Sequence, residues 1–202
     1  MQLEAHPSAF PNAEFEQLMA RYQQADPGAV AVLVERLSPQ LYRFFASQLG
    51  NRADAEDMLQ DTWLRIHRVR HTYRAGDPVL PWVYTIARNA CVDGARREQL
   101  RSAEPLAEEP LDKGTPWNDP ERGAGSAELR PLLEAAIAAL PKEQREVFLL
   151  REFAGIPFAE IARMTAAPEP TVKSRMRYAL EALRAHLLRA GVESDAPGRT
   201  AS

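Results

Sequence analysis

The segment 102–125 constrains the fold more than any other part of this sequence. Its 24 residues include four prolines and three glycines, and no apolar period survives across them. Such a stretch favours a flexible, acidic, extended linker over a helix or strand. It divides the 202-residue chain into two domains, which we place at 13–101 and 126–190. The ends, 1–12 and 191–202, are expected to be loose tails.

Both predicted domains follow helical periodicity, so we expect an all-α fold of two small helical domains. Asp26 followed by Pro27 is a typical helix start, and the helix that begins there should reach Leu49 with a kink or interruption at Pro39. Further helices are expected at 52–71, 81–101, 127–140, 142–153, 157–164 and 169–189. No segment shows the period-two alternation of a strand.

The composition argues against an enzyme, a metalloprotein and a membrane protein. The single cysteine, Cys91, rules out a disulfide framework, and the four histidines are too scattered to suggest a metal site. No nucleophile–base pair or phosphate-binding glycine loop appears, so we expect no catalytic residue, metal, cofactor or small-molecule substrate. No apolar run approaches a membrane span and no signal-peptide pattern is present, which predicts a cytoplasmic protein without direct membrane insertion.

The net charge of −3 hides two basic segments. Residues 62–101 hold eight basic against three acidic residues, net +5, and residues 163–202 hold seven against four, net +3. The stretch 102–122 between them has two against six, net −4. A net-acidic protein can bind nucleic acid if its positive charge lies on one face, although charge also fluctuates along any chain.

The helix expected at 52–71 has an apolar face and an opposite face where acidic groups surround a leucine. The apolar face, expected to be core, holds Met58, Leu59, Thr62, Trp63, Ile66 and Val69. The opposite face holds Asp57, Gln60, Asp61, Leu64 and His67. Such a face suits docking of a basic helix from a partner, although a solvated face with one stray leucine is also common.

The helix expected at 81–101 combines an aromatic residue at one end with arginines at the other. Val83, Ala87, Ala90 and Cys91 form its apolar side, and the other side holds Trp82, Ile86, Asn89, Asp93, Arg96 and Arg97. A ring on which bases stack, followed by arginines that neutralise phosphates, suits single-stranded or melting DNA. The alternative is that Trp82 and Tyr84 fill the core and the arginines form an ordinary helix C-terminus.

A short helix, a tight turn and a longer helix over 157–189 predict a helix-turn-helix. The inward stripe of the longer helix is expected to be Val172, Met176, Ala179, Leu180, Leu183 and Leu187. Lys173, Ser174, Arg175, Arg177 and Tyr178 flank that stripe near the N-terminal end, where a recognition helix contacts the major groove. The alternative is a helical hairpin with a purely structural role. It is less favoured, because it does not explain why the basic residues cluster at the N-terminal end of the longer helix.

Together these segments resemble the small bacterial RNA polymerase sigma factors of the extracytoplasmic-function (ECF) group, within the sigma-70 superfamily. The stretch DAEDMLQDTWLR at 54–65 resembles region 2.2, and PWVYTIARN at 81–89 with Asp93, Arg96 and Arg97 resembles regions 2.3 and 2.4. The stretch ALPKEQREVF at 139–148 resembles region 4.1, and Ile161-Ala162 with TVKSR at 171–175 resembles region 4.2.

The resemblance implies a subunit that brings core RNA polymerase to promoter DNA and takes part in melting that DNA. Such a subunit performs no bond chemistry itself. Core polymerase would be bound by Asp57, Gln60, Asp61 and Leu64. The melted non-template strand of the minus-ten element would be bound by Arg74, Trp82, Tyr84, Asn89, Asp93, Arg96 and Arg97. The duplex minus-thirty-five element would be bound by Thr171, Lys173, Ser174, Arg175 and Arg177. An anti-sigma factor, often membrane-bound, and target genes for stress or envelope responses are also implied.

Two other functions remain open at this point. A sigma-like protein that only titrates an anti-sigma factor should lose the basic face of 81–101 or of 169–180, and neither is lost. A stand-alone helix-turn-helix regulator would not need the acidic face or the long linker, and it would commonly dimerise. Two residues of the turn depart from the resemblance. Ala166 stands where glycine is common, and an alanine in a left-handed conformation costs about 1 kcal/mol. Pro170 replaces another frequent glycine, at a position in the first helical turn that accepts proline.

Overall fold

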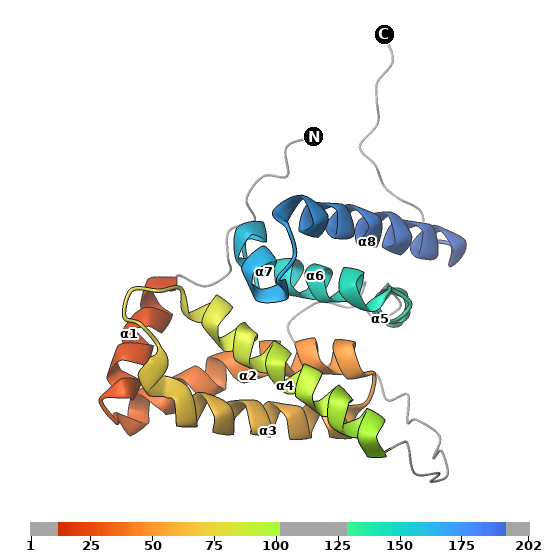
Figure 1. The fold of residues 1–202 in the computed structure, drawn as a ribbon. Coiled ribbons are helices and arrows are strands. Elements are labelled where there is room, and N and C mark those ends of the chain that lie inside the picture. The colour runs from red at the N-terminus through yellow and green to blue at the C-terminus, as the bar shows by residue number, and fades with distance from the viewer. Residues whose placement is uncertain (1–11, 102–128, 193–202) are drawn as a thin grey trace.

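The computed structural model describes residues 12–101 and 129–192, whose helices form two packed groups (Figure 1). The first group is α1 (Asn12–Gln23), α2 (Pro27–Leu49), α3 (Arg52–Val69) and α4 (Val79–Arg101), with the short 3-10 helix η1 (Arg70–Thr72) after α3. The second group is α5 (Leu129–Ala138), α6 (Lys142–Glu152), α7 (Phe158–Thr165) and α8 (Glu169–Arg189). Because the described residues contain no strand, the all-α prediction is confirmed. The predicted linker lies outside the described residues.

The helix α1 was missed by the periodicity argument. Phe15, Leu18, Met19 and Tyr22 recur at the spacing of one helical face, and each is at least 93% buried. They pack into the core of the first group, where α1 lies against α2 and α4. The signal was present in the sequence, next to a stretch that we expected to be a tail.

The helix α2 runs without interruption from Pro27 to Leu49, so a break at Pro39 is wrong. Leu33 and Leu37 before the proline and Leu41 after it are all buried, so both halves of the helix are anchored in the same core. Pro39 itself is exposed, and so is Glu35, whose carbonyl oxygen loses its helical donor and can be satisfied by water. The helix starts as expected, with an Asp26 carboxylate oxygen accepting from the Gly28 N–H at 2.9 Å.

The second group is organised around α8, which packs on α5, α6 and α7. Val172, Met176, Ala179 and Leu183 form its buried stripe, as predicted. Leu180 does not belong to this stripe, because its side chain is 40% exposed. At 3.6 residues per turn Leu180 lies about 80° around the helix from Val172, at the edge of the buried sector.

The two groups contact each other through five helices. The helix α2 lies against α5 and α6, and α4 lies against α7 (Figure 1). These contacts join parts of the chain that are separated by the linker sequence. No helix within 12–101 or 129–192 is long and apolar enough to cross a membrane.

Candidate nucleic-acid interface

The predicted docking face of α3 is exposed and belongs to a charge network. Leu64 is 56% exposed, and Asp57 and Gln60 are exposed on the same side of the helix. The Arg65 guanidinium donates to Asp61 at 2.9 Å and to Asp93 of α4 at 2.6 Å. Arg65 therefore ties the docking face of α3 to the basic helix α4.

The carboxyl of Asp93 serves this network. The hydrogen bond from Arg65, with the nearby charges of Arg65, Arg97 and Arg96, holds the pKa of Asp93 below its usual range. Asp93 thus stays ionised and balances part of the basic charge at this end of α4. Sequence reasoning missed Arg65, although its position four residues after Asp61 is a known signal of a helical ion pair.

The exposed side of α4 holds Asn89, Arg96 and Arg97, as predicted. Trp82 is half-buried and packs edge-on against Tyr73, with ring centroids 5.5 Å apart. Its indole is therefore positioned by the core while part of its surface stays open. Arg74 is exposed in the loop that leads from η1 to α4.

Tyr84 was expected among the DNA-binding residues, and the structure overturns that expectation. Its side chain is 1% exposed and meets the ring of Phe44 at a right angle, with centroids 5.4 Å apart. Burial also raises the pKa of its hydroxyl well above the usual value. Tyr84 is therefore a core residue. This agrees with the alternative interpretation that Trp82 and Tyr84 fill the core, except that Trp82 is only partly buried.

The loop between η1 and α4 is held in place by side chains that the sequence did not single out. Gln23 of α1 donates through Nε2 to the carbonyl oxygens of Arg70 and Tyr73, both at 2.8 Å. The Tyr73 hydroxyl donates to the carbonyl oxygen of Asp77 across the same loop. These bonds orient the loop that carries Arg74 relative to Trp82. Gln23 is 47 positions from Arg70 and 50 positions from Tyr73 in the sequence. Hydrogen bonds over such separations leave no local sequence signal.

The helices α7 and α8 form the predicted helix-turn-helix. Ala166 adopts the left-handed conformation with φ 51° and ψ 35°, at the position where we noted alanine in place of glycine. Pro170 lies in the first turn of α8, where its missing N–H costs no helical bond. Ile161 and Val172 are fully buried and fix the two helices against each other.

The N-terminal part of α8 presents its polar residues to solvent. Thr171, Lys173 and Arg177 are exposed, and Ser174 and Arg175 are partly exposed. Lys173 pairs with Glu169 at 2.7 Å, and the Arg177 guanidinium lies 4.8 Å from the ring centroid of Tyr178. The Ser174 hydroxyl donates to the carbonyl oxygen of Pro170 at 2.9 Å, which leaves it as an acceptor for other groups. The exposed ion pair between Lys173 and Glu169 is weak, so Lys173 can contact a phosphate in its place.

The cysteine Cys91 behaves as the predicted small hydrophobe. Burial raises the pKa of its thiol to about 12, so the reactive thiolate is scarce at neutral pH. No group of three or more histidine, cysteine, aspartate or glutamate side chains in the described parts of the chain is arranged to hold a metal ion.

Chemically, the described surfaces offer two separate basic sites and one acidic docking face. The face of α3 and the basic side of α4 lie in the first group, bridged by Arg65, and the recognition helix α8 lies in the second. This arrangement is typical of helical DNA-binding proteins: the described chain has two exposed basic surfaces, of which the second lies on a helix-turn-helix.

Comparison with known proteins gives the family. Residues 33–101 match the family model of sigma-70 region 2, and residues 130–183 match that of sigma-70 region 4. The chain is 32% identical over 171 residues to the ECF RNA polymerase sigma factor SigL of Mycobacterium tuberculosis, covering 83% of this chain and 94% of that protein. It is 33% identical over 166 residues to the ECF sigma factor RpoE of Cereibacter sphaeroides, covering 80% and 88%. The chain therefore belongs to the ECF group of the sigma-70 family.

Solved structures show the same fold. The sigma factor RpoE from Bartonella quintana, in a complex with the anti-sigma factor NepR, superposes with a TM-score of 0.65 at 22% identity. That alignment covers 79% of this chain and 96% of the other. CnrH, solved with the cytosolic domain of CnrY, gives a TM-score of 0.61 at 21% identity, covering 88% and 98%.

Proposed function

We propose that this sigma factor binds core RNA polymerase through the α3 face and selects promoters by contacting two DNA elements. In this assignment Asp57, Gln60, Asp61 and Leu64 dock on the polymerase. The exposed residues of α4 and its preceding loop (Arg74, Trp82, Asn89, Arg96 and Arg97) engage the minus-ten element as it melts. Thr171, Lys173, Ser174, Arg175 and Arg177 engage the minus-thirty-five duplex.

The observation that carries this proposal is the coexistence of two exposed basic surfaces with an exposed leucine among carboxylates. Trp82 and the arginines of α4 combine a stacking surface with phosphate-neutralising charge, which is what a strand leaving the duplex needs. The N-terminal end of α8 has the residue types that contact guanine and phosphate in a major groove. A protein that only titrated a partner would need neither basic surface.

Regulation by an anti-sigma factor belongs to the same proposal. One solved structure of similar fold is a sigma factor bound to an anti-sigma factor, and another is CnrH bound to the cytosolic domain of CnrY. We further propose that the target genes answer stress or envelope signals. Catalysis would rest entirely with the polymerase, and the chain would act in the cytoplasm where that polymerase works.

Run-off transcription tests the proposed function. Purified protein is mixed with sigma-free core polymerase and fragmented genomic DNA of the host, and the 5′ ends of the RNA are sequenced. Discrete start sites that share two upstream elements are expected. If no start site appears while a control sigma factor proves the core active, the proposal fails and a titrating protein or simple DNA-binding regulator takes its place.

A further inference from the structure

The loop between η1 and α4 is exposed, although the residues at its two ends are buried. Residues 74–78 are all exposed, whereas Tyr73 before them and Val79 after them belong to the core. An exposed segment without regular structure would ordinarily sample many shapes. The shape of this loop therefore depends on its hydrogen bonds.

Residues 74–77 form a tight turn. The Asp77 N–H donates to the carbonyl oxygen of Arg74 at 3.1 Å, and Gly76, the third residue of the turn, has a φ of 91°. Glycine adopts this conformation without strain. The buried Tyr73 donates its hydroxyl to the carbonyl oxygen of Asp77 and so holds the far end of the turn. Burial, with the charges of Glu16 and Asp77, raises the pKa of this hydroxyl to about 12, so it stays protonated and remains a donor.

Gln23 holds the start of the loop from another helix. Its Nε2 donates to the carbonyl oxygens of Arg70 and Tyr73, both at 2.8 Å, at the point where η1 leads into the loop. The side chain is only partly exposed, so water does not easily replace it. A side chain of the same size without N–H groups would leave both carbonyl oxygens without this donor.

The position of Gln23 is itself fixed by its neighbour Tyr22. The Tyr22 side chain is 4% exposed, and its hydroxyl lies 2.9 Å from Nδ1 of His67 on α3. The Arg70 guanidinium lies 5.7 Å from the centroid of the same ring, within the range of a cation–π contact. The end of α1 is therefore attached to both α3 and η1, and Gln23 acts from a rigid base.

The anchored turn lies next to the surface that we assign to the minus-ten strand. The Tyr73 ring packs against Trp82 with centroids 5.5 Å apart, so one residue contacts both the turn and the proposed stacking surface. Asp77 and Pro78 of the loop line a hollow of about 500 Å³ together with Trp82 and Asn89 of α4. A base that stacked on Trp82 would therefore lie close to the turn.

The turn presents main-chain groups to solvent. The N–H groups of Ala75 and Gly76 have no hydrogen-bond partner among the described residues, and both residues are exposed. Every such peptide group offers the same donor and acceptor, so these groups can select a base edge only if they are held in a fixed place. A shape that is fixed before binding also avoids the entropy cost of ordering the loop on DNA.

We propose that Gln23 is a positioning residue for promoter recognition: it holds the turn 74–77 in one preformed shape beside Trp82, and this shape sets the base preference at one position of the minus-ten element. Contact with the minus-ten strand rests on the proposed function, whereas the anchoring of the turn does not. Gln23 does not touch DNA in this assignment and acts only through the carbonyl groups that it holds.

Amide hydrogen exchange measured by NMR tests the anchoring in the free chain. The test variants are Gln23→Met, which keeps the size of the side chain without its N–H groups, and Tyr73→Phe, which keeps the ring and removes the hydroxyl. Each hydrogen bond of this kind contributes a factor of roughly two to ten, so the Asp77 amide should exchange about fivefold or more faster in both variants.

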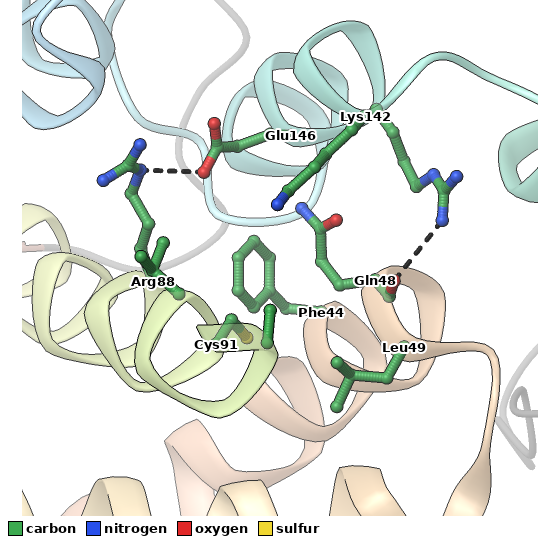
Figure 2. A pocket seen from close by; sticks show the side chains of 10 residues that line it. Phe44, Gln48, Leu49, Arg88, Cys91, Lys142 and Glu146 are labelled. Atoms are coloured by element: carbon green, nitrogen blue, oxygen red, sulfur yellow. Dashed lines mark hydrogen bonds and ion pairs between the residues drawn. The ribbon is translucent and has the colours of Figure 1, made fainter. Parts of the chain in front are cut away.

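The matched control is Gln48→Met, the same substitution at another partly exposed glutamine. Gln48 lies near the opposite end of α2, about 30 Å along that helix, and lines a separate hollow of about 270 Å³ (Figure 2). The control should keep the wild-type exchange rate of the Asp77 amide.

Transcription from a promoter library tests the effect on base preference. A promoter mapped by run-off transcription is randomised in its minus-ten and minus-thirty-five elements, each template carries a barcode in its transcribed part, and the RNA made with core polymerase is sequenced. Both test variants should lose about three- to tenfold of the preference for the favoured base at the same minus-ten position. They should keep the other preferences, including those in the minus-thirty-five element, and the control should keep all of them.

Unchanged exchange of the Asp77 amide in both folded variants would overturn the anchoring. Faster exchange with unchanged base preferences would overturn the role of Gln23 in recognition. An equal loss of preference at every position, or a uniform loss of transcription, would overturn it as well, because a purely structural residue would act in that way. No transcription start with the wild-type chain would refute the proposed function and with it the role in recognition, while the exchange rates would still decide the anchoring.

Discussion

Replacing Lys173 and Arg177 by alanine should weaken binding to the promoter duplex in a salt-dependent way and leave polymerase binding intact. Both side chains are exposed on the N-terminal half of α8, and each has a solvent-exposed acidic neighbour. Lys173 lies 2.7 Å from Glu169, and Arg177 lies 3.8 Å from Glu181. Exposed pairs of this kind contribute roughly 0–1 kcal/mol, so both cations can turn to phosphates at little cost.

The size of the effect follows from the charges that are released. Each phosphate neutralised on duplex DNA contributes about 0.9 to the slope of log affinity against log salt. Arg177 forms only a loose pair with Glu181, so its phosphate contact should contribute the full amount to the slope. Lys173 should contribute less, because Glu169 takes up a counterion from solution when Lys173 turns to a phosphate. The slope of the double variant should therefore fall by about 1–1.8. Between 50 and 200 mM salt the wild-type protein should lose about four- to twelvefold more affinity than the variant.

Fluorescence anisotropy with a labelled minus-thirty-five duplex, titrated at several salt concentrations, measures this slope. The matched control is Arg184→Ala with Arg189→Ala, which removes the same charge from exposed positions about 18 Å further along α8. The control should retain the wild-type slope. An unchanged slope in the Lys173 and Arg177 variant, or equal losses of duplex and polymerase affinity, would refute the assignment of α8 as the duplex reader.

Three further predictions concern single surfaces. Asp61→Arg with Leu64→Ala should raise the dissociation constant for core polymerase by roughly tenfold or more in a binding titration, because an exposed leucine and its neighbouring charge are removed from the docking face. Ala166→Gly should stabilise the second helical group by about 0.5–1 kcal/mol in urea unfolding, since relief of left-handed strain exceeds the added chain entropy. Tyr84→Phe should keep full transcription and stabilise the fold by about 1 kcal/mol, because the buried hydroxyl has no hydrogen-bond partner among the described residues.

Each of these has a clear contrary result. Unchanged polymerase affinity would return the α3 face to an ordinary solvated surface. A destabilised Ala166→Gly variant would contradict the strain argument at the turn. Loss of promoter melting in a stable Tyr84→Phe variant would show that the hydroxyl acts on DNA after all.

Local patterns were sufficient to predict most helices and both basic surfaces. The buried stripe of α8 and the exposed set around Lys173 follow from helical spacing and charge alone. Tyr84 was misassigned because it is aromatic like Trp82, and the sequence does not show which of the two rings is buried. The burial of Tyr84 depends on its packing against Phe44, which comes from another helix. Pro39 misled because its effect is decided by the packing on either side rather than by the residue itself.

The contacts between distant segments could not be predicted. Gln23 gives no local hint that it will hold the loop before α4, and Arg145 gives none that it will complete the end of α2. Arg88 and Glu146 are 58 positions apart, and their pairing depends on how the two helical groups meet. Such interactions depend on tertiary geometry, which periodicity and composition do not contain.

Permanganate footprinting on a promoter mapped by run-off transcription tests the central claim most directly. Permanganate oxidises unpaired thymines, so it detects melting around the start site without requiring RNA synthesis. The account predicts reactive thymines in the minus-ten region only when this protein and core polymerase are both present. Duplex binding by the complex without any reactive thymine would contradict the claim that the chain directs promoter opening.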